Sequence, residues 1–89
     1  MNNLVNAEKV LKALANRRRL AILVFLKKNR EGSVSRIAGA INLSFKSTSR
    51  HLNVMMLADI LEKEQRSTEV FYKIYLNLEK MAKGVVSLL

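Results

Sequence analysis

The scarcity of helix-breaking residues is the strongest constraint on what this chain can fold into. Its 89 residues include no proline and only three glycines. Apolar residues recur at helical spacing through most of the N-terminal two thirds, which predicts a series of amphipathic helices. We expect four of them: one over roughly Leu4–Ala15, one capped by Asn16, a short one capped by Ser33 or Ser35, and one that is capped by Ser44 and ends near Asp59.

The apolar positions of these helices indicate which residues face the core. In the second helix the expected inward residues are Leu20, Leu23, Val24 and Leu26, and in the third they are Ile37, Ala38 and Ile41. The cations of "KKNREGS", with Gly32 just beyond them, mark the end of the second helix. The second helix is therefore the expected core helix of the fold.

The pattern changes after Leu61. The segments "LEKEQR" and "EVFYKIYL" alternate in polarity or are rich in β-forming residues, and the turn "ST" separates them, which predicts a β-hairpin. One face of its second strand is expected to carry Val70, Tyr72, Ile74 and Leu76. Asn77 is the expected cap of a last helix, "LEKMAKGVVSLL". Without a visible repeat or linker, residues 1–89 are predicted to form one mainly α-helical domain with a single small hairpin.

Size and charge limit the function classes. A domain of 89 residues buries a modest fraction of its surface, and without cysteine it has neither disulfides nor thiolate metal sites. Association is the remaining source of stability. The formal net charge of +9 favours a polyanionic partner, nucleic acid before an anionic membrane surface. No secretory signal is visible and "LAILVFL" is too short to span a bilayer, so a cytoplasmic protein is expected.

The segment "SFKSTSRHLNVMM", from Ser44 to Met56, collects hydroxyls, cations and the only histidine in its first half and apolar residues in its second. At about 100° per residue, one side carries Lys46, Arg50 and Asn53, with Ser47 and Ser49 at its edges. The opposite side carries Ser44, Thr48, Leu52, Met55 and Asp59, flanked by Phe45, His51 and Met56.

Such a helix suits the DNA major groove, where basic and amide side chains meet bases and hydroxyls meet phosphates. Capping hydroxyls and a solvated outer face explain this segment, taken alone, about equally well. The neighbouring segments decide between the two interpretations. A short helix, a tight turn, this helix and then a hairpin is the order of a winged helix-turn-helix.

Three segments of the chain, "LKALANRRRLAILVFL", "SVSRIAGAINLSFKSTSRHLNVM" and "VFYKI", resemble the winged helix-turn-helix repressors of the ArsR/SmtB type over about residues 9–76. The resemblance implies a homodimer whose first and last helices form the interface, a fourth helix that reads operator DNA, and a wing that touches the flanking backbone or minor groove. The expected DNA contacts are Lys46, Ser47, Arg50 and Asn53, assisted by Thr48, Ser49 and His51, with Lys63, Arg66, Ser67 and Thr68 from the wing. The expected dimer seam joins Leu4, Val10, Leu11 and Leu14 to Met81, Val85 and Leu88.

The chain departs from this family where its members bind metals. The cysteine-valine-cysteine pattern of metal sensors is replaced by Ser33-Val34-Ser35, and neutral hydroxyls are poor ligands for soft metals. The last helix offers only Glu79 for a zinc site, which needs four ligands. We therefore expect no metal and no other cofactor. One histidine, no cysteine and no glycine-rich phosphate loop also argue against an enzyme.

Several residues have two possible roles. In the wing, Glu62, Glu64 and Glu69 oppose Lys63 and Arg66, so a small contribution to DNA affinity is expected. Asp59 replaces the glycine that commonly ends the recognition helix, but aspartate tolerates a left-handed backbone. The run Arg17-Arg18-Arg19 opposes a helix dipole. It could contact phosphate, pair with a buried carboxylate, or be a solvated run with one structural arginine, which is the favoured reading.

The predicted function is that of a homodimeric repressor that binds an inverted-repeat operator in double-stranded DNA. One alternative is an architectural DNA binder without sequence preference. A second is a protein-interaction module that uses Met56 and Leu57 against a partner, although Leu57 is more simply an exposed apolar residue. A membrane binder built on "RRRLAILVFLKK" is disfavoured because that helix is expected in the core.

Overall fold

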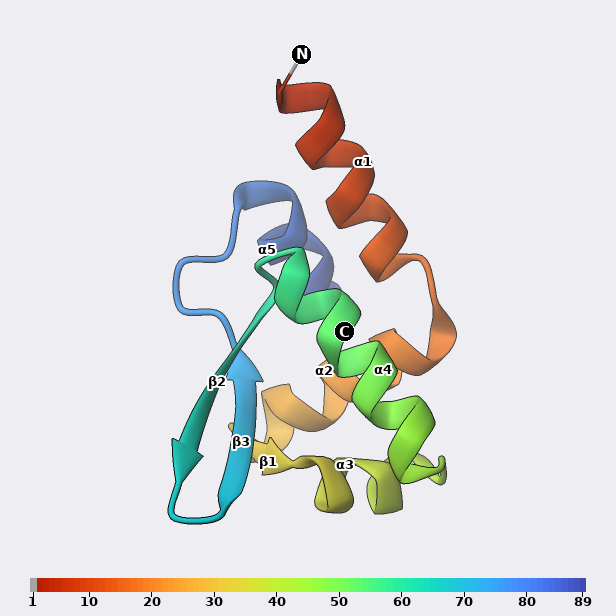
Figure 1. Cartoon of the computed structure of the whole chain (residues 1–89). Helices are drawn as coiled ribbons and strands as arrows, with labels where there is room; N and C mark the ends of the chain where they lie inside the picture. Colours follow the sequence, from red (N-terminus) through yellow and green to blue (C-terminus); the bar gives the residue numbers. More distant parts are fainter. Residues whose placement is uncertain (1) are drawn as a thin grey trace.

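The computed structural model describes residues 2–89, apart from the side chain of Asn2. These residues form five helices and three short strands (Figure 1). In chain order they are α1 (Asn2–Leu14), α2 (Arg17–Asn29), β1 (Gly32–Ser33), α3 (Val34–Ile41), α4 (Phe45–Leu57), β2 (Leu61–Arg66), β3 (Glu69–Ile74) and α5 (Lys80–Leu88). The mainly helical winged helix-turn-helix expected from the sequence is confirmed. None of the helices in the described part of the chain is long and apolar enough to cross a bilayer.

Three helices begin where the sequence predicts. The side chains of Asn16, Ser33 and Ser44 accept hydrogen bonds from the backbone N–H groups three residues later, at 3.1, 3.2 and 3.1 Å. Each bond satisfies one of the free donors in a first helical turn. The tight turn between α3 and α4 is made by Asn42 in the left-handed region, with φ of 57°. The helix-turn-helix is therefore built from local capping.

The hairpin also forms as predicted, with a third strand added. Strands β2 and β3 pair in antiparallel register from Leu61 opposite Ile74 to Arg66 opposite Glu69. Ser67 makes the turn with φ of 59°, and Asp59 takes the left-handed conformation expected of it, with φ of 57°. The sequence gives no sign of β1, which pairs with the free edge of β3.

Gly32 has a different role from the one expected. It does not end α2 with a left-handed backbone, because that conformation belongs to Arg30, with φ of 72°. Instead Gly32 lies buried in β1, where an added Cβ would stand 2.9 Å from the ring of Phe25 and 3.1 Å from Ile37. The glycine allows β1 to pass close to α2 and α3.

The start of α5 differs from the prediction. Its N-cap is Glu79, whose carboxylate accepts a hydrogen bond from the N–H of Ala82 at 2.6 Å, rather than Asn77. A carboxylate also complements the positive end of the helix dipole. The chain before it makes a turn at Leu76 and Asn77, where the N–H of Leu76 donates to Glu62 at 3.0 Å. Leu76 is consequently exposed instead of sharing the inner face of β3.

The core lies where α2, α3 and α4 meet the base of the wing. Its fully buried apolar side chains are Ile22, Leu23, Leu26, Ile37, Leu52, Met55 and Ile60. Val24 was expected there, but it is exposed, because the inward side of α2 runs through Ile22 and Leu26. Val10 and Leu14 of α1 also belong to this core. Both side chains are nearly buried within one copy, so their expected place in the dimer seam stays a prediction.

Candidate nucleic-acid interface

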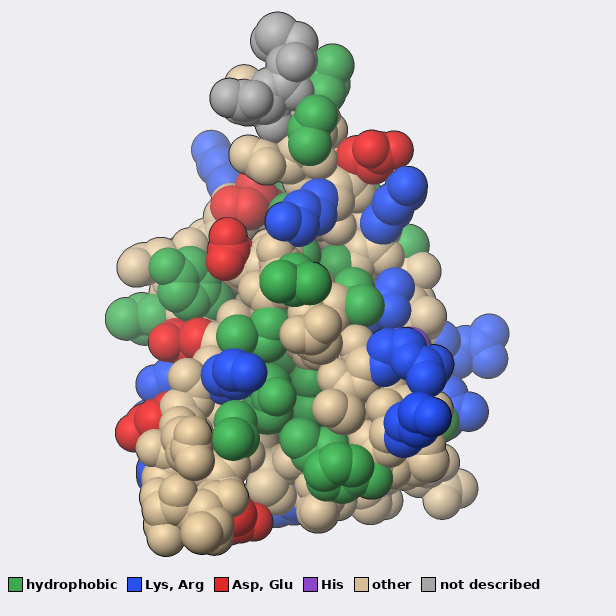
Figure 2. All heavy atoms as spheres, viewed as in Figure 1, with side chains coloured by type: hydrophobic (Ala, Val, Ile, Leu, Met, Phe, Trp, Pro, Cys, Tyr) green, Lys and Arg blue, Asp and Glu red, His purple; other side chains and the backbone are tan. Residues whose placement is uncertain are grey.

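The outward side of α4 carries the cations that the sequence assigns to DNA. Lys46, Arg50 and Asn53 are exposed, whereas Leu52 and Met55 on the other side are fully buried. Ser47 and Ser49 lie half-buried at the edges. Figure 2 shows lysine and arginine side chains grouped at the right of the face that α4 presents, beside hydrophobic side chains at its centre. The buried side of α4, its back, packs into the core, and the opposite side, its front, faces solvent.

The exposed cations of α4 are not neutralised by the protein itself. Among residues 2–89, no carboxylate lies within 4.0 Å of Lys46 or Arg50. Both side chains therefore remain available to an external hydrogen-bond acceptor, such as a phosphate oxygen or a base acceptor in the major groove.

Thr48 does not belong to this surface. It is 0% exposed, so its expected supporting contact with DNA is wrong. Its position four residues before the core residue Leu52 places it on the buried stripe. Within the described residues, its hydroxyl oxygen has no hydrogen-bond partner. A buried hydroxyl without a partner is destabilising.

We expect Thr48→Val to stabilise the folded domain by about 1 kcal/mol, because it removes the unpaired hydroxyl and keeps the volume of the side chain. The midpoint of urea unfolding at an unchanged m-value measures this. Thr48→Ser is the matched control, since it keeps the hydroxyl and removes the methyl group. A lower midpoint for Thr48→Val than for wild type would show that the hydroxyl finds a partner.

Arg19 is the structural arginine of the Arg17-Arg18-Arg19 run. Its guanidinium donates to the backbone carbonyls of Ala13 at 2.6 Å and Lys12 at 3.1 Å. These carbonyls belong to the last turn of α1, where the helix itself supplies no N–H partner. The guanidinium also donates to Nδ1 of His51 on α4 at 3.1 Å. One side chain thus joins the first helix of the fold to its recognition helix. Arg17 and Arg18 are exposed, and a phosphate contact by them stays a prediction.

His51 is held in its neutral form by this contact. A guanidinium can only donate hydrogen bonds, so Nδ1 accepts and the ring proton is on Nε2. Burial lowers the pKa of His51 below its ordinary value of 6.5, and the positive charges of Arg19, Arg50 and Arg18 lower it further. The half-buried ring is therefore a packed histidine with one satisfied nitrogen, and a direct DNA contact by its other nitrogen stays a prediction.

The lowered pKa of His51 predicts a pH dependence of folding. Below about pH 6.5 the unfolded chain binds a proton at this ring while the folded chain does not, so stability falls as pH drops through the window below 6.5. The urea midpoint of the wild type should therefore fall more between about pH 7.5 and 5.5 than that of His51→Gln. Equal pH dependence in the two proteins would contradict this assignment.

The wing presents fewer free cations than its sequence contains. Arg66 donates to both carboxylate oxygens of Glu31, at 2.7 and 2.5 Å, and its guanidinium lies 4.6 Å from the centre of the Phe71 ring. This pairing raises the pKa of Arg66 and lowers that of Glu31. Lys63, Ser67 and Thr68 are exposed. Arg66 is thus engaged within the chain, and its expected DNA contact would require exchange of Glu31 for phosphate.

Two exposed apolar side chains on α4 are not assigned to DNA by the sequence. Phe45, expected on the flank of the buried side, is 59% exposed, and Leu57 is 63% exposed. Phe45 is the first residue of the helix, so no preceding turn covers its ring. The helical wheel indicates position around the axis but not the open space at the end of a helix.

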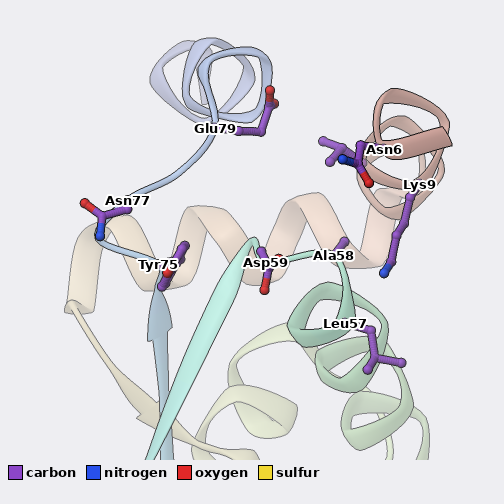
Figure 3. Close-up of a pocket in the computed structure, with 9 residues that line it drawn as sticks. Asn6, Lys9, Leu57, Ala58, Asp59, Tyr75, Asn77 and Glu79 are labelled. Carbon is purple, nitrogen blue, oxygen red and sulfur yellow. The ribbon is translucent and has the colours of Figure 1, made fainter. Parts of the chain in front are cut away.

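A pocket of about 250 Å³ lies between α1, the end of α4 and the segment that leads into α5 (Figure 3). Its charged lining consists of Lys9, Asp59 and Glu79. Two carboxylates against one lysine make it unfavourable for a phosphate, so it is not part of the nucleic-acid interface. Within residues 2–89, no cluster of three histidine, cysteine or acidic side chains could hold a metal.

A scan against protein-family models gives no match, and a search of curated proteins gives none either. Solved structures are similar over nearly the whole chain. The homodimeric winged helix-turn-helix DNA-binding domain of Mb0332 from Mycobacterium bovis, a possible ArsR-family transcriptional regulator, is 29% identical with a TM-score of 0.83, covering 98% of this chain and 77% of that one.

Two further structures show the same similarity. HlyU from Vibrio cholerae is 31% identical with a TM-score of 0.81, covering 98% of this chain and 87% of that one. The transcriptional repressor PagR of Bacillus anthracis is 26% identical with a TM-score of 0.80, covering 97% and 94%. The fold, the cationic outward side of α4 and these similarities agree. The chain belongs to the ArsR/SmtB family of winged helix-turn-helix transcriptional regulators.

Proposed function

We propose that this chain is a homodimeric repressor that binds an inverted-repeat operator through the major groove. The observation that carries the proposal is the exposed row of Lys46, Arg50 and Asn53 on a helix whose back is buried. Arginine and lysine pair with guanine O6 and N7, and asparagine pairs with adenine N6 and N7. Ser47 and Ser49, at the edges of the row, are suited to phosphate contacts.

The proposed dimer uses the apolar residues that α1 and α5 leave uncovered. Leu4 is 70% and Leu11 is 50% exposed on α1, and the neighbouring Val5 is exposed as well. On α5, Leu88 is exposed while Met81 and Val85 are half-buried. An uncovered apolar surface of this kind marks an association site. A second copy of the chain is the proposed partner, because the similar Mb0332 domain is homodimeric.

We expect Leu11→Glu to weaken the dimer at least tenfold while the protomer stays folded, since this side chain is already half exposed in one copy. Sedimentation equilibrium measures the dissociation constant, and circular dichroism confirms the fold. Leu76→Glu, at an exposed leucine outside α1 and α5, is the matched control. If Leu11→Glu left the dimer as tight as Leu76→Glu did, the interface would lie elsewhere.

Selection of bound sequences from a random duplex pool at about 0.15 M salt tests the proposed function. A dimer with two recognition helices is expected to enrich a palindrome whose half-sites are about 34 Å apart, one helical turn of DNA. Binding without enrichment, with a steep salt dependence, would instead identify an architectural protein. Absence of duplex binding would favour a protein-interaction module, to which the exposed Leu57 would contribute.

A further inference from the structure

Phe45 is an apolar side chain in a position that the rest of the recognition surface makes polar. It is the first residue of α4, directly after the capping Ser44, and next to the exposed Lys46. The residue is 59% exposed, although the same helix buries Leu52 and Met55 completely. Exposed apolar area is unfavourable in water, and only contact with another surface removes it. The protein itself therefore leaves most of this residue uncovered.

Phe45 lies at the start of α4, on the side that faces the start of α3 and the wing. The ring borders an open groove of about 330 Å³ whose other walls come from the start of α3 and from β3 with its turn. Val34 and Val70 supply apolar lining, and Ser35 and Thr68 supply hydroxyls. The groove is not closed over the ring. A partner that approaches the front of α4 would meet Phe45 and Lys46 together.

We propose that Phe45 reads the C5-methyl group of a thymine in each operator half-site. Among the base-edge groups in the major groove, this methyl group offers the largest apolar surface, and most of the others are hydrogen-bond donors or acceptors. A phenyl ring cannot satisfy a donor or an acceptor, so contact with any other base edge would desolvate a polar group without replacement. The inference rests on the proposed function, because it assumes that the front of α4 enters the major groove.

The test replaces thymine by uracil, which removes only the methyl group. In the palindrome obtained by selection, each thymine is replaced in turn, symmetrically in both half-sites. One position is expected to lower the affinity of the wild type about fourfold per half-site, the loss typical of one buried methyl group, and therefore about 15-fold for the dimer.

Variants of Phe45 test whether this side chain causes the loss of affinity for the uracil duplex. Phe45→Ala should bind the thymine and uracil duplexes equally, and Phe45→Leu should retain part of the discrimination. Leu57→Ala is the matched control, since it removes another exposed apolar side chain of α4 and should keep the full ratio. Circular dichroism verifies that each variant is folded.

The outcomes separate this inference from the proposed function. If a palindrome is enriched but no thymine position is sensitive to uracil, the reading by Phe45 is overturned and the regulator function stands. The same holds if Phe45→Ala keeps the wild-type ratio. If no duplex is enriched, both fail together.

Discussion

Arg50→Ala is expected to abolish specific operator binding and to leave the dimer folded. The guanidinium is exposed, and within residues 2–89 no carboxylate pairs with it, so its removal costs the protein no internal ion pair. A bidentate contact between arginine and guanine contributes about 1–3 kcal/mol of discrimination. A dimer loses two such contacts, about 2–6 kcal/mol, if the half-sites are independent.

Fluorescence anisotropy with the selected palindrome, at about 0.15 M salt, measures this loss. Lys28→Ala is the matched control, because it removes one exposed positive charge from the last turn of α2, a different helix from α4. It should lower affinity only through the general electrostatic field. Unchanged operator affinity of Arg50→Ala would remove this residue from the interface.

Leu52→Ala is expected to destabilise the domain by about 2–5 kcal/mol. Leu52 is 0% exposed on the inner side of α4, and its removal leaves a cavity where α4 meets the core. Small domains are stable by only about 5–15 kcal/mol, so this loss is a large part of the total. DNA binding should be lost to the extent that the variant unfolds.

Urea unfolding at constant m-value measures the change. The neighbouring Asn53→Ala provides the comparison, because Asn53 is exposed and its removal should leave the midpoint nearly unchanged while weakening DNA binding. A loss below about 1 kcal/mol for Leu52→Ala would show that the back of α4 is not anchored as described.

Much of the fold could be predicted from the sequence. The caps Asn16 and Ser44 were predicted correctly, and Ser33 was one of the two candidates for α3, because each acts through a hydrogen bond within its own helical turn. The exposed row Lys46, Arg50 and Asn53 followed from helical spacing alone. The start of α5 was predicted wrongly, because asparagine is the usual N-cap and Asn77 was chosen, whereas Asn77 lies in a turn and Glu79 caps the helix.

The candidate site was predicted less completely than the fold. Thr48 was assigned to DNA although it is buried, and Phe45 was placed beside the core although most of the residue is exposed. Arg66 was assigned to the wing surface without its partner Glu31. In each case the exposure or pairing of the side chain depends on contacts with other segments of the chain, which the local pattern does not show.

The sequence by itself determined the order of the helices and the hairpin, the caps that begin α2 and α4, the wing turn and the cationic character of α4. These features depend on the conformational preferences of single residues and on hydrogen bonds within a few positions. Only the tertiary structure decided that Arg19 joins α1 to His51, that Val10 and Leu14 belong to the core, and that Arg66 is paired. Such contacts join residues far apart along the chain, so packing of the whole domain sets them.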